Sequence, residues 1–350
     1  MQFHKAALSF FSTLLLLMLL AVPFIISSGA VTDEARQRYE SVTDEFDEDE
    51  DDIWEAARIA FPDKKIRGML ASASMSDILP ANDIAALPIS NSPGKNPVKA
   101  NFSETGYRDD TIIVEIEKRQ MFDSDVFVAY VKIATPSQLR TTYAGNKLGS
   151  TRTNHTSRLS SNYNGIVAIN GDFYANTKAG FIVRQGETYR EKTSKNMDLL
   201  LIDEMGDFHI LLRGHKEQEA GVKAFKEEHE IVNGFFFGPG LVIDGQVQEI
   251  PKEYQFDPNA KNPRAAIGQS GPLTYIMVAV NGRTDTSKGV TLKELAEIMA
   301  ELGCQQAYNL DGGNSATLAF NGAVFNDKPQ SERGVSDIIY FATATEQGDS

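Results

Sequence analysis

Short apolar runs with strand-like alternation recur along the chain from residue 111 onward, and they constrain the fold more than any other feature. Residues 111–117 and 125–133 alternate apolar and polar side chains with a period of two, as paired strands do. Further strand candidates are residues 166–170, 199–202, 208–212, 235–243, 273–280, 306–311, 317–320 and 337–341. With 350 residues, 41% of them hydrophobic, the chain can bury one large core or two modest ones. The pattern predicts a strand-rich α+β domain with a mixed sheet and few helices.

One helix is clearly indicated, over residues 291–302. Thr291 and Glu294 have the spacing of a capping box, and apolar side chains recur along one face of the segment. The strand candidates 273–280 and 306–311 flank it, which makes a β-α-β unit. If these strands run in the same direction in one sheet, both carboxyl ends emerge on one edge. The turns that follow them, each polar and glycine-containing, would then converge.

The turn after the second of these strands reads Asn309-Leu-Asp-Gly-Gly-Asn-Ser-Ala-Thr317. Asp311 would stand at the carboxyl end of a buried strand, and Gly312 and Gly313 let the backbone take positive φ and approach a ligand closely. The alternative is a hairpin in which Asp and Gly serve only the turn.

Two other segments place charge beside a strand end. Asn170-Gly-Asp172 follows an apolar strand candidate, although, taken alone, an Asn-Gly hairpin turn explains it better. Arg264 leads directly into a strand, where its planar guanidinium suits an anionic oxygen pair; a structural salt bridge is the commoner use of such a residue. Carboxylates and guanidinium groups next to glycine turns fit a polar, anionic substrate.

Four motifs in this order resemble the phosphodiester glycosidase family. They are Asn170-Gly-Asp-Phe-Tyr174, Arg264-Ala-Ala-Ile-Gly268, Asn281-Gly-Arg283 followed by Ser287-Lys-Gly-Val-Thr-Leu292, and the Asp311 turn. The resemblance covers roughly residues 100–343 and implies an α+β domain that hydrolyses the bond between the anomeric carbon of a sugar and a phosphodiester. The expected substrate is a phosphate-linked carbohydrate, with N-acetylglucosamine or a related sugar released in free form.

The resemblance also implies which residues form the site. The catalytic set that it implies is Asp172, Asp311, Arg264 and Arg283. The substrate-binding set is Asn170, Gly171, Gly312, Gly313, Asn314, Ser315, Thr317, Asn281 and Ser287. In the family, Asp often stands at the position of Asn281, and a third glycine is common at the position of Asn314. We expect the carboxylates to act at the anomeric carbon and the arginines to stabilise the phosphate.

Two other functions remain open from the residues alone. One is a non-catalytic glycan-binding or scaffold domain, and the other is a metal-dependent phosphodiesterase that cuts the P–O bond. Asp172, Asp311 and nearby amide oxygens could hold Ca²⁺ or Mg²⁺. The histidines have no zinc-like spacing, and we expect His155, His209, His215 and His229 to be surface or loop residues.

Most of the net charge of −14 lies in one acidic segment. Residues 33–55 hold twelve acidic and two basic side chains, which leaves about −4 for the rest of the chain. A block of like charge repels itself and favours a solvated tether. No basic stripe interleaved with aromatics indicates nucleic-acid binding. The single cysteine, Cys304, excludes an internal disulfide and is expected to be a buried small apolar residue.

The amino-terminal segment predicts export. Residues 6–26 carry no charge and are long enough to span a bilayer, which takes about 20 helical residues. We therefore expect residues 1–30 to be a signal peptide or membrane anchor, 31–100 an acidic spacer containing Pro and Ser, and 101–345 the catalytic domain. The protein would then be secreted, or held at the cell surface through its N-terminal helix, and would act on a cell-envelope glycan such as an exopolysaccharide.

Overall fold

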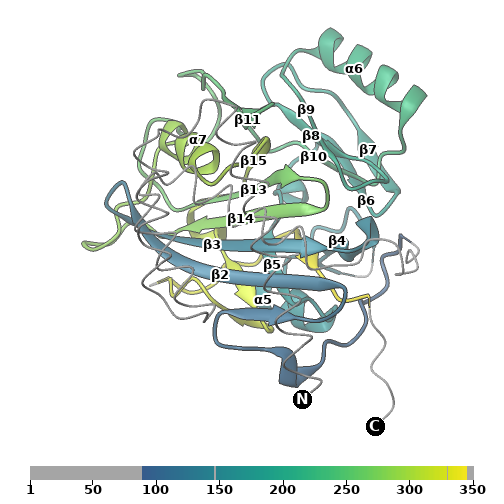
Figure 1. Cartoon of the computed structure of the whole chain (residues 1–350). Helices are drawn as coiled ribbons and strands as arrows, with labels where there is room; N and C mark the ends of the chain where they lie inside the picture. Colours follow the sequence, from purple (N-terminus) through teal and green to yellow (C-terminus); the bar gives the residue numbers. More distant parts are fainter. Residues whose placement is uncertain (1–88, 146, 329, 345–350) are drawn as a thin grey trace, which may run out of the picture. The chain divides into compact units, whose positions relative to one another are not determined.

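Three sheets form the part of the chain that the computed structural model describes, residues 89–145, 147–328 and 330–344 (Figure 1). The large sheet has the order β1 (Gly106–Arg108), β2 (Ile112–Met121), β3 (Ser124–Ile133), β14 (Thr274–Val280), β13 (Arg264–Gly271), β15 (Gln306–Leu310), β11 (Gly240–Ile243) and β12 (Gln246–Val247). The β5 sheet has the order β17 (Ala323–Val324), β16 (Leu318–Phe320), β5 (Val167–Asn170), β18 (Asp337–Phe341) and β4 (Leu139–Tyr143). The β8 sheet has the order β7 (Glu187–Glu191), β6 (Phe181–Arg184), β10 (Asn233–Phe235), β8 (Leu199–Ile202) and β9 (Phe208–Leu211). Every pairing among these strands is antiparallel.

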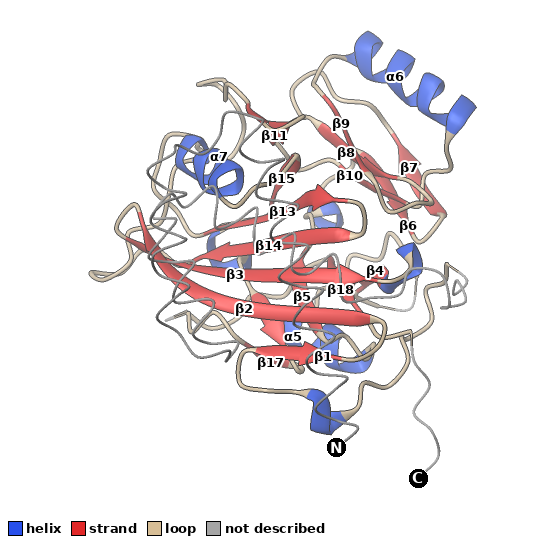
Figure 2. Ribbon diagram, viewed as in Figure 1, coloured by secondary structure: helices blue, strands red, loops and turns tan. Residues whose placement is uncertain are grey.

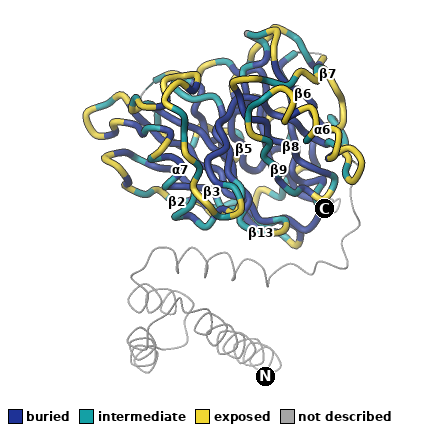
Figure 3. Tube along the Cα trace, turned by 90° about the horizontal axis from the view of Figure 1, so that it is seen from above, coloured by how far each residue is buried: buried dark blue, intermediate teal, exposed yellow. Residues whose placement is uncertain are grey.

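Helices cover the outer faces of the sheets (Figure 2). The described helices are α5 (Thr156–Asn162), α6 (His215–Glu228) and α7 (Leu292–Glu301), with short 3-10 turns at Lys99–Asn101, Pro136–Gln138, Tyr174–Asn176 and Gly313–Ser315. One apolar cluster joins α7 to the large sheet, a second joins α5 to the β5 sheet, and a third joins α6 to the β8 sheet. The main core lies between the large sheet and the β5 sheet and extends to β8 and β10. Figure 3 shows these strands buried inside a shell of exposed loops.

The predicted strand-rich α+β class is confirmed, and so is the predicted helix. The predicted mixed sheet was wrong, because the two strands that run in the same direction, β14 and β15, are separated by the antiparallel strand β13. In α7 the Oγ1 of Thr291 accepts from the backbone N–H of Glu294, and the carboxylate of Glu294 accepts from the N–H of Thr291, which completes the capping box. β14 and β15 run in the same direction, because each pairs antiparallel with β13 between them. Their carboxyl ends therefore share one edge of the large sheet, as the β-α-β pattern predicts.

The strand prediction over residues 235–243 was wrong. The segment divides into the end of β10 and the whole of β11, which belong to different sheets. Pro239 lies between the two strands, and a proline has no N–H to donate to a strand partner. An unbroken apolar run therefore carries the chain from the β8 sheet into the large sheet.

Contacts with the domain begin before residue 101. Arg140, which is buried in β4, donates from Nη2 to the carbonyls of Ser90 and Ser92 at 3.0 and 2.9 Å. The predicted leader and most of the predicted spacer, residues 1–88, lie outside the described residues. Within the described ranges, no helix combines the length and the apolar content that a membrane span requires.

Candidate functional site

The Asp311 turn connects two sheets, and this connection places it at the centre of the candidate site. Residues 311–317 join β15 of the large sheet to β16 of the β5 sheet. The amide of Asn170, at the end of β5, donates to the carbonyl of Asp311 at 2.7 Å, and the N–H of Asp311 donates to the carbonyl of Gly171 at 3.2 Å. Asn170 Oδ1 also accepts from the N–H of Thr317 at 3.1 Å. The two glycine turns that sequence analysis identified therefore lie against each other.

Asp311 is the carboxylate of this junction that reaches the surface. Its side chain is 14% exposed, and Oδ2 accepts from Ser315 Oγ at 2.7 Å and from Arg333 Nη2 at 2.6 Å. Burial raises the pKa of Asp311, the guanidinium of Arg333 and the hydroxyl of Ser315 lower it, and the charge of Asp172 raises it. The net effect is a raised pKa, which suits a group that exchanges protons.

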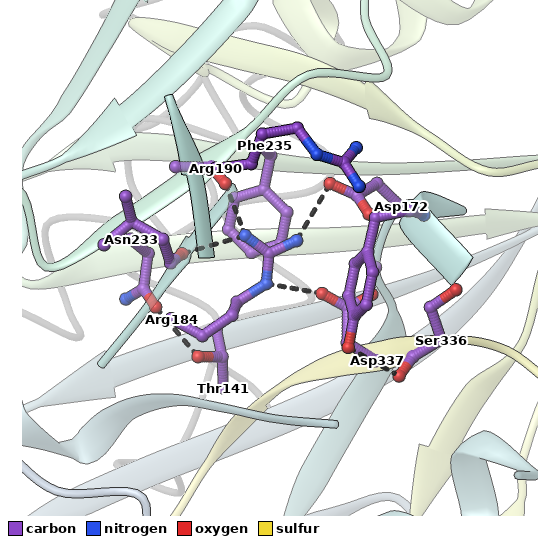
Figure 4. A network of polar contacts seen from close by, with 12 residues as sticks. Thr141, Asp172, Arg184, Arg190, Asn233, Phe235, Ser336 and Asp337 are labelled. Atoms are coloured by element: carbon purple, nitrogen blue, oxygen red, sulfur yellow. Dashed lines mark hydrogen bonds and ion pairs between the residues drawn. The ribbon is translucent and has the colours of Figure 1, made fainter. Parts of the chain in front are cut away.

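Asp172 belongs to a buried ion-pair network with Arg184 and Asp337 (Figure 4). Its Oδ2 accepts from Arg184 Nη2 at 2.8 Å, and both side chains are fully buried. Arg184 also donates from Nε to Asp337, and its guanidinium stacks on the ring of Phe235 at 3.8 Å from the centroid. One buried arginine thus holds two carboxylates in place.

Asp337 explains why residue 171 is glycine. A Cβ at Gly171 would lie only 2.3 Å from Asp337 Oδ1, so any larger residue would push the carboxylate away. Burial raises the pKa of Asp337 to about 7, although the charge of Arg184 opposes the rise. The absence of a side chain at Gly171 makes room for this carboxylate, and its predicted contact with substrate stays a prediction.

Arg283 reaches the same turn from the end of β14. It is exposed, and it donates from Nη1 to Asn314 Oδ1 at 3.3 Å and from Nη2 to Asn262 Oδ1 at 2.9 Å. A Cβ at Gly313 would lie 3.4 Å from Arg283 Nη2, which places the guanidinium directly over the double glycine. Its charge therefore faces neutral amide oxygens, which leaves it suited to an anionic ligand.

Arg264 begins β13, as sequence analysis placed it, but its guanidinium is bonded to backbone carbonyls. It is buried, and its guanidinium donates to the carbonyls of Val290, Phe256, Asp257 and Ala260. Desolvation lowers the pKa of Arg264 to about 10. These bonds hold the 256–260 loop in place, so the structure shows Arg264 as a clamp on that loop, beside the turn at Gly312.

The loop that Arg264 holds carries an aromatic face. Phe256 is 41% exposed and stacks on Phe237 with ring centroids 4.6 Å apart. Phe173, which directly follows Asp172, meets both rings edge-to-face. Tyr174, Phe181 and Phe235, by contrast, are buried in the core.

Two predicted substrate-binding residues lie in supporting loops. Asn281 is buried and exchanges amide hydrogen bonds with Asn326. The hydroxyl of Ser287 donates to the carbonyl of Asn281 at 2.9 Å and accepts from the N–H of Asp125 at 3.0 Å. The structure therefore brings neither side chain to the Asp311 carboxylate, and both fix the backbone that carries Arg283.

Four charged residues of the site were not found from the sequence: Arg184, Lys328, Arg333 and Asp337. Arg184 and Asp337 do carry a signal, because each places a charge at the end of an apolar run in a strand, as Arg264 does. Lys328 donates to the carbonyl of Asn314 at 2.7 Å and to Thr317 Oγ1 at 2.9 Å, and burial lowers its pKa to about 8. Lys328 and Arg333 lie in a loop without periodicity, so no local pattern marks them.

The carboxylates of this site do not fit a Ca²⁺ or Mg²⁺ ion. Oδ2 of Asp172 is bonded to Arg184, and Oδ2 of Asp311 is bonded to Arg333 and Ser315. A divalent cation, which prefers several oxygen ligands free of competing positive charge, would face these guanidinium groups directly. The chemistry of the site is therefore that of arginine-paired carboxylates.

Comparison with known proteins identifies the family of this chain. The family model for phosphodiester glycosidase (NAGPA) matches residues 163–342, just over half of the chain. The chain belongs to the phosphodiester glycosidase family. The matched range contains the Asp172 and Asp311 turns, together with Arg184, Arg283 and Arg333.

Relatives of known sequence match shorter segments. The chain is 32% identical over 138 residues to the SPbeta prophage-derived uncharacterized protein YomE of Bacillus subtilis, covering 39% of this chain and 21% of that protein. It is 35% identical over 66 residues to the N-acetylglucosamine-1-phosphodiester alpha-N-acetylglucosaminidase of Bos taurus, covering 19% of this chain and 12% of that protein. The chain therefore matches only a minor part of the length of either relative.

A solved structure shares the fold. The catalytic domain of zebrafish N-acetylglucosamine-1-phosphodiester alpha-N-acetylglucosaminidase, auto-inhibited by its pro-peptide, superposes with a TM-score of 0.53 at 17% identity. The match covers 75% of this chain and 99% of that domain. The chain therefore contains nearly the whole fold of that catalytic domain.

Proposed function

We propose that this protein hydrolyses a sugar-1-phosphodiester, releasing the free sugar and a phosphomonoester. Membership of the phosphodiester glycosidase family supports the reaction class. The observation that carries the proposal is the arrangement around Asp311, where a surface-reaching carboxyl group with a raised pKa lies in a turn shared with the exposed Arg283. N-acetylglucosamine is our first choice of sugar, because the bovine relative is an N-acetylglucosamine-1-phosphodiester alpha-N-acetylglucosaminidase.

Asp311 is the residue to which we assign proton transfer. Water attacks the anomeric carbon, the bond from that carbon to the phosphate oxygen breaks, and the electron pair leaves with the phosphate. Asp311 takes the proton that the water loses. Most glycosidases use two carboxyl groups, one of which protonates the leaving group. A phosphate is a weakly basic leaving group that needs little protonation, so the proposed reaction uses one acid–base carboxyl group.

Asp172 has an electrostatic role in this proposal. Its side chain is fully buried and paired with Arg184, so it does not present an oxygen to the surface. Its negative charge raises the pKa of Asp311, and its turn positions the backbone against which Asp311 is bonded. We therefore propose that Asp172 positions and tunes Asp311.

The phosphate group would lie against Arg283 and Arg333. Both side chains are exposed and both contact the Asp311 turn, Arg283 at Asn314 and Arg333 at Asp311 and Ser315. Neutralising the charge that develops on the leaving oxygen is the function that arginine serves in phosphate sites. Arg264 is not assigned to the phosphate, because its donors are bonded to backbone carbonyls. The exposed ring of Phe256 offers an apolar surface for the sugar.

A substrate panel tests the proposal. The full chain is incubated with sugar-1-phosphodiesters that differ in the sugar and in the group beyond the phosphate, and free sugar is measured. We expect release of free sugar from at least one phosphodiester and none from the matching sugar glycosides that lack phosphate. Binding of the panel without any release, by a folded protein, would indicate a glycan-binding domain instead.

Replacing Arg333 with methionine should move the pH dependence of the reaction. The guanidinium lowers the pKa of Asp311, so its removal lets that pKa rise further. The limb of the kcat/KM profile that reports Asp311 should therefore shift to higher pH, as measured across a range of buffers at constant ionic strength.

Arg283→Met serves as the matched control for this shift. Arg283 contacts Asn262 and Asn314 rather than Asp311, so its loss should raise KM for the phosphodiester and leave the limb in place. A limb that stays fixed in the Arg333→Met protein, while turnover is retained, would show that Asp311 is not the titrating group.

The cellular location of the protein, and so of its natural substrate, is proposed from the sequence. The uncharged residues 6–26 and the acidic residues 33–55 lie outside the described residues, and they favour export followed by a tether. We therefore propose a phosphate-linked glycan of the cell surface as the natural substrate. Detection of the protein only inside the cytoplasm, by cell fractionation, would contradict this location.

A further inference from the structure

A cluster of two histidines and one aspartate lies in the β8 sheet, outside the elements that carry the Asp311 turn. Asp203 follows β8, His209 is in β9, and His229 caps the carboxyl end of α6. One ligand atom from each of the three residues lies within 4.8 Å of the other two. Both histidines are partly exposed, as expected of surface residues, and the fold brings them together although they are twenty residues apart in the sequence.

The spacing of the ligand atoms matches a small coordination sphere. Asp203 Oδ2 lies 2.9 Å from His209 Nε2, in a hydrogen bond that a bound ion would replace, and 3.6 Å from His229 Nδ1. Two ligands of a tetrahedral zinc ion, each at about 2.1 Å from the metal, are separated by roughly 3.4 Å. The observed separations lie on either side of that value.

A second observation points to a missing partner for these groups. The Nδ1 atom of His229 is buried and makes no hydrogen bond among the described residues. It faces a carboxylate oxygen at 3.6 Å, which is too long for a hydrogen bond. Buried nitrogen atoms without a partner are costly, and an ion held between the ring and the carboxylate would remove that cost.

The surroundings hold the ligands in fixed orientations. Asp203 Oδ1 accepts from the backbone N–H groups of Met205 and Asp207 at 2.9 and 2.8 Å, which leaves Oδ2 directed at the imidazoles. Phe225 of α6 contacts both imidazole rings, with centroid distances of 5.0 and 5.1 Å. Metal sites characteristically orient their ligands through such outer contacts.

We infer that Asp203, His209 and His229 form a binding site for a zinc-like transition-metal ion. Two imidazole nitrogens and one carboxylate favour Zn²⁺ over Ca²⁺ or Mg²⁺, which prefer oxygen ligands. Glu204 Oε1 lies 3.7 Å from His229 Nδ1 and offers a further ligand at the exposed side. The ion would tie the carboxyl end of α6 to the β8–β9 hairpin, a structural role that does not depend on the proposed hydrolysis.

Metal titration of the full chain tests the inference. The protein is first treated with a chelator and exchanged into metal-free buffer, and Co²⁺ is then added while the visible spectrum is recorded. We expect one Co²⁺ ion per chain with the intense absorption of tetrahedral coordination, displaced by Zn²⁺. We also expect Zn²⁺ to raise the melting temperature of the chelator-treated protein.

Single substitutions identify the ligands. His209→Gln and His229→Gln should each weaken Zn²⁺ binding by more than about tenfold, because loss of even an outer-shell partner commonly costs about 10–100-fold. His215→Gln is the matched control, since His215 also belongs to α6 but contacts Thr193. The acidic segment is intact in every variant, so any metal that it binds contributes equally to all of them.

Two results would overturn the inference of a metal site. The circular dichroism spectra of the metal-free variants establish that they are folded before affinity is compared. Absence of a tetrahedral Co²⁺ spectrum in the parent protein would overturn the inference. Unchanged Zn²⁺ affinity in both folded variants would overturn it as well.

Discussion

Replacing Asp311 with asparagine is expected to lower kcat by about 10²–10⁴-fold, the range typical of losing a general acid or base. Asparagine keeps the shape of the side chain and can still accept from Ser315 and Arg333, but it cannot exchange a proton at neutral pH. The fold should therefore persist while turnover is lost. The measurement is initial-rate release of free sugar from the best phosphodiester of the panel.

Asp110→Asn is the control for this substitution. Asp110 is an exposed turn residue between β1 and β2, so the same chemical change there should leave kcat within experimental error. Equal melting curves for the parent and both variants would show that folding is unaffected. Parental turnover by a folded Asp311→Asn protein would remove Asp311 from the mechanism.

Replacing Arg184 with methionine should lower the free energy of unfolding by about 3–5 kcal/mol, the usual cost of removing one partner from a buried ion pair. Asp172 and Asp337 would lose the cation that both contact, and neither side chain can reach water for solvation. The carbonyls of Val183 and Gly234 would also lose their donor. Urea unfolding at neutral pH measures the change.

Lys226→Met provides the contrast, because it removes an ion pair at the surface. Lys226 and Glu191 are 44% and 36% exposed, and exposed pairs contribute less than about 1 kcal/mol. If Arg184→Met cost no more than Lys226→Met, the buried network would not be a major source of stability. The position of Asp172 would then need another explanation.

Elements with a regular pattern were predicted correctly from the sequence. β2 and β3 alternate apolar and polar residues, and α7 carries its capping box, so local rules decide these elements. α6 was missed because its buried residues are only Gln218, Val222 and Phe225 in an otherwise charged helix. β4 was missed because its residues are mostly polar and show no apolar alternation. They are buried all the same, and their side chains form hydrogen bonds with distant residues, such as that of Thr141 with Asn233.

The site was predictable in part for a similar reason. Asp172 and Asp311 each follow an apolar strand and lie next to a glycine, Gly171 and Gly312 respectively. This local pattern identified both carboxylates from the sequence. Their cationic partners could not be identified from the nearby sequence, because tertiary structure brings them together: Arg184 ends β6, and Arg333 lies in the loop before β18. The role of Arg264 could not be told from sequence, because a buried arginine bonded to carbonyls carries the same local pattern as one that binds phosphate.

The position of an oxygen isotope tests the central claim most directly. The full chain hydrolyses a sugar-1-phosphodiester in ¹⁸O-labelled water, and mass spectrometry locates the label in the products immediately after release. Cleavage of the bond to the anomeric carbon predicts label in the free sugar and an unlabelled phosphomonoester. Label in the phosphomonoester would mean that the P–O bond is cut, and it would contradict the assignment of this protein as a glycosidase.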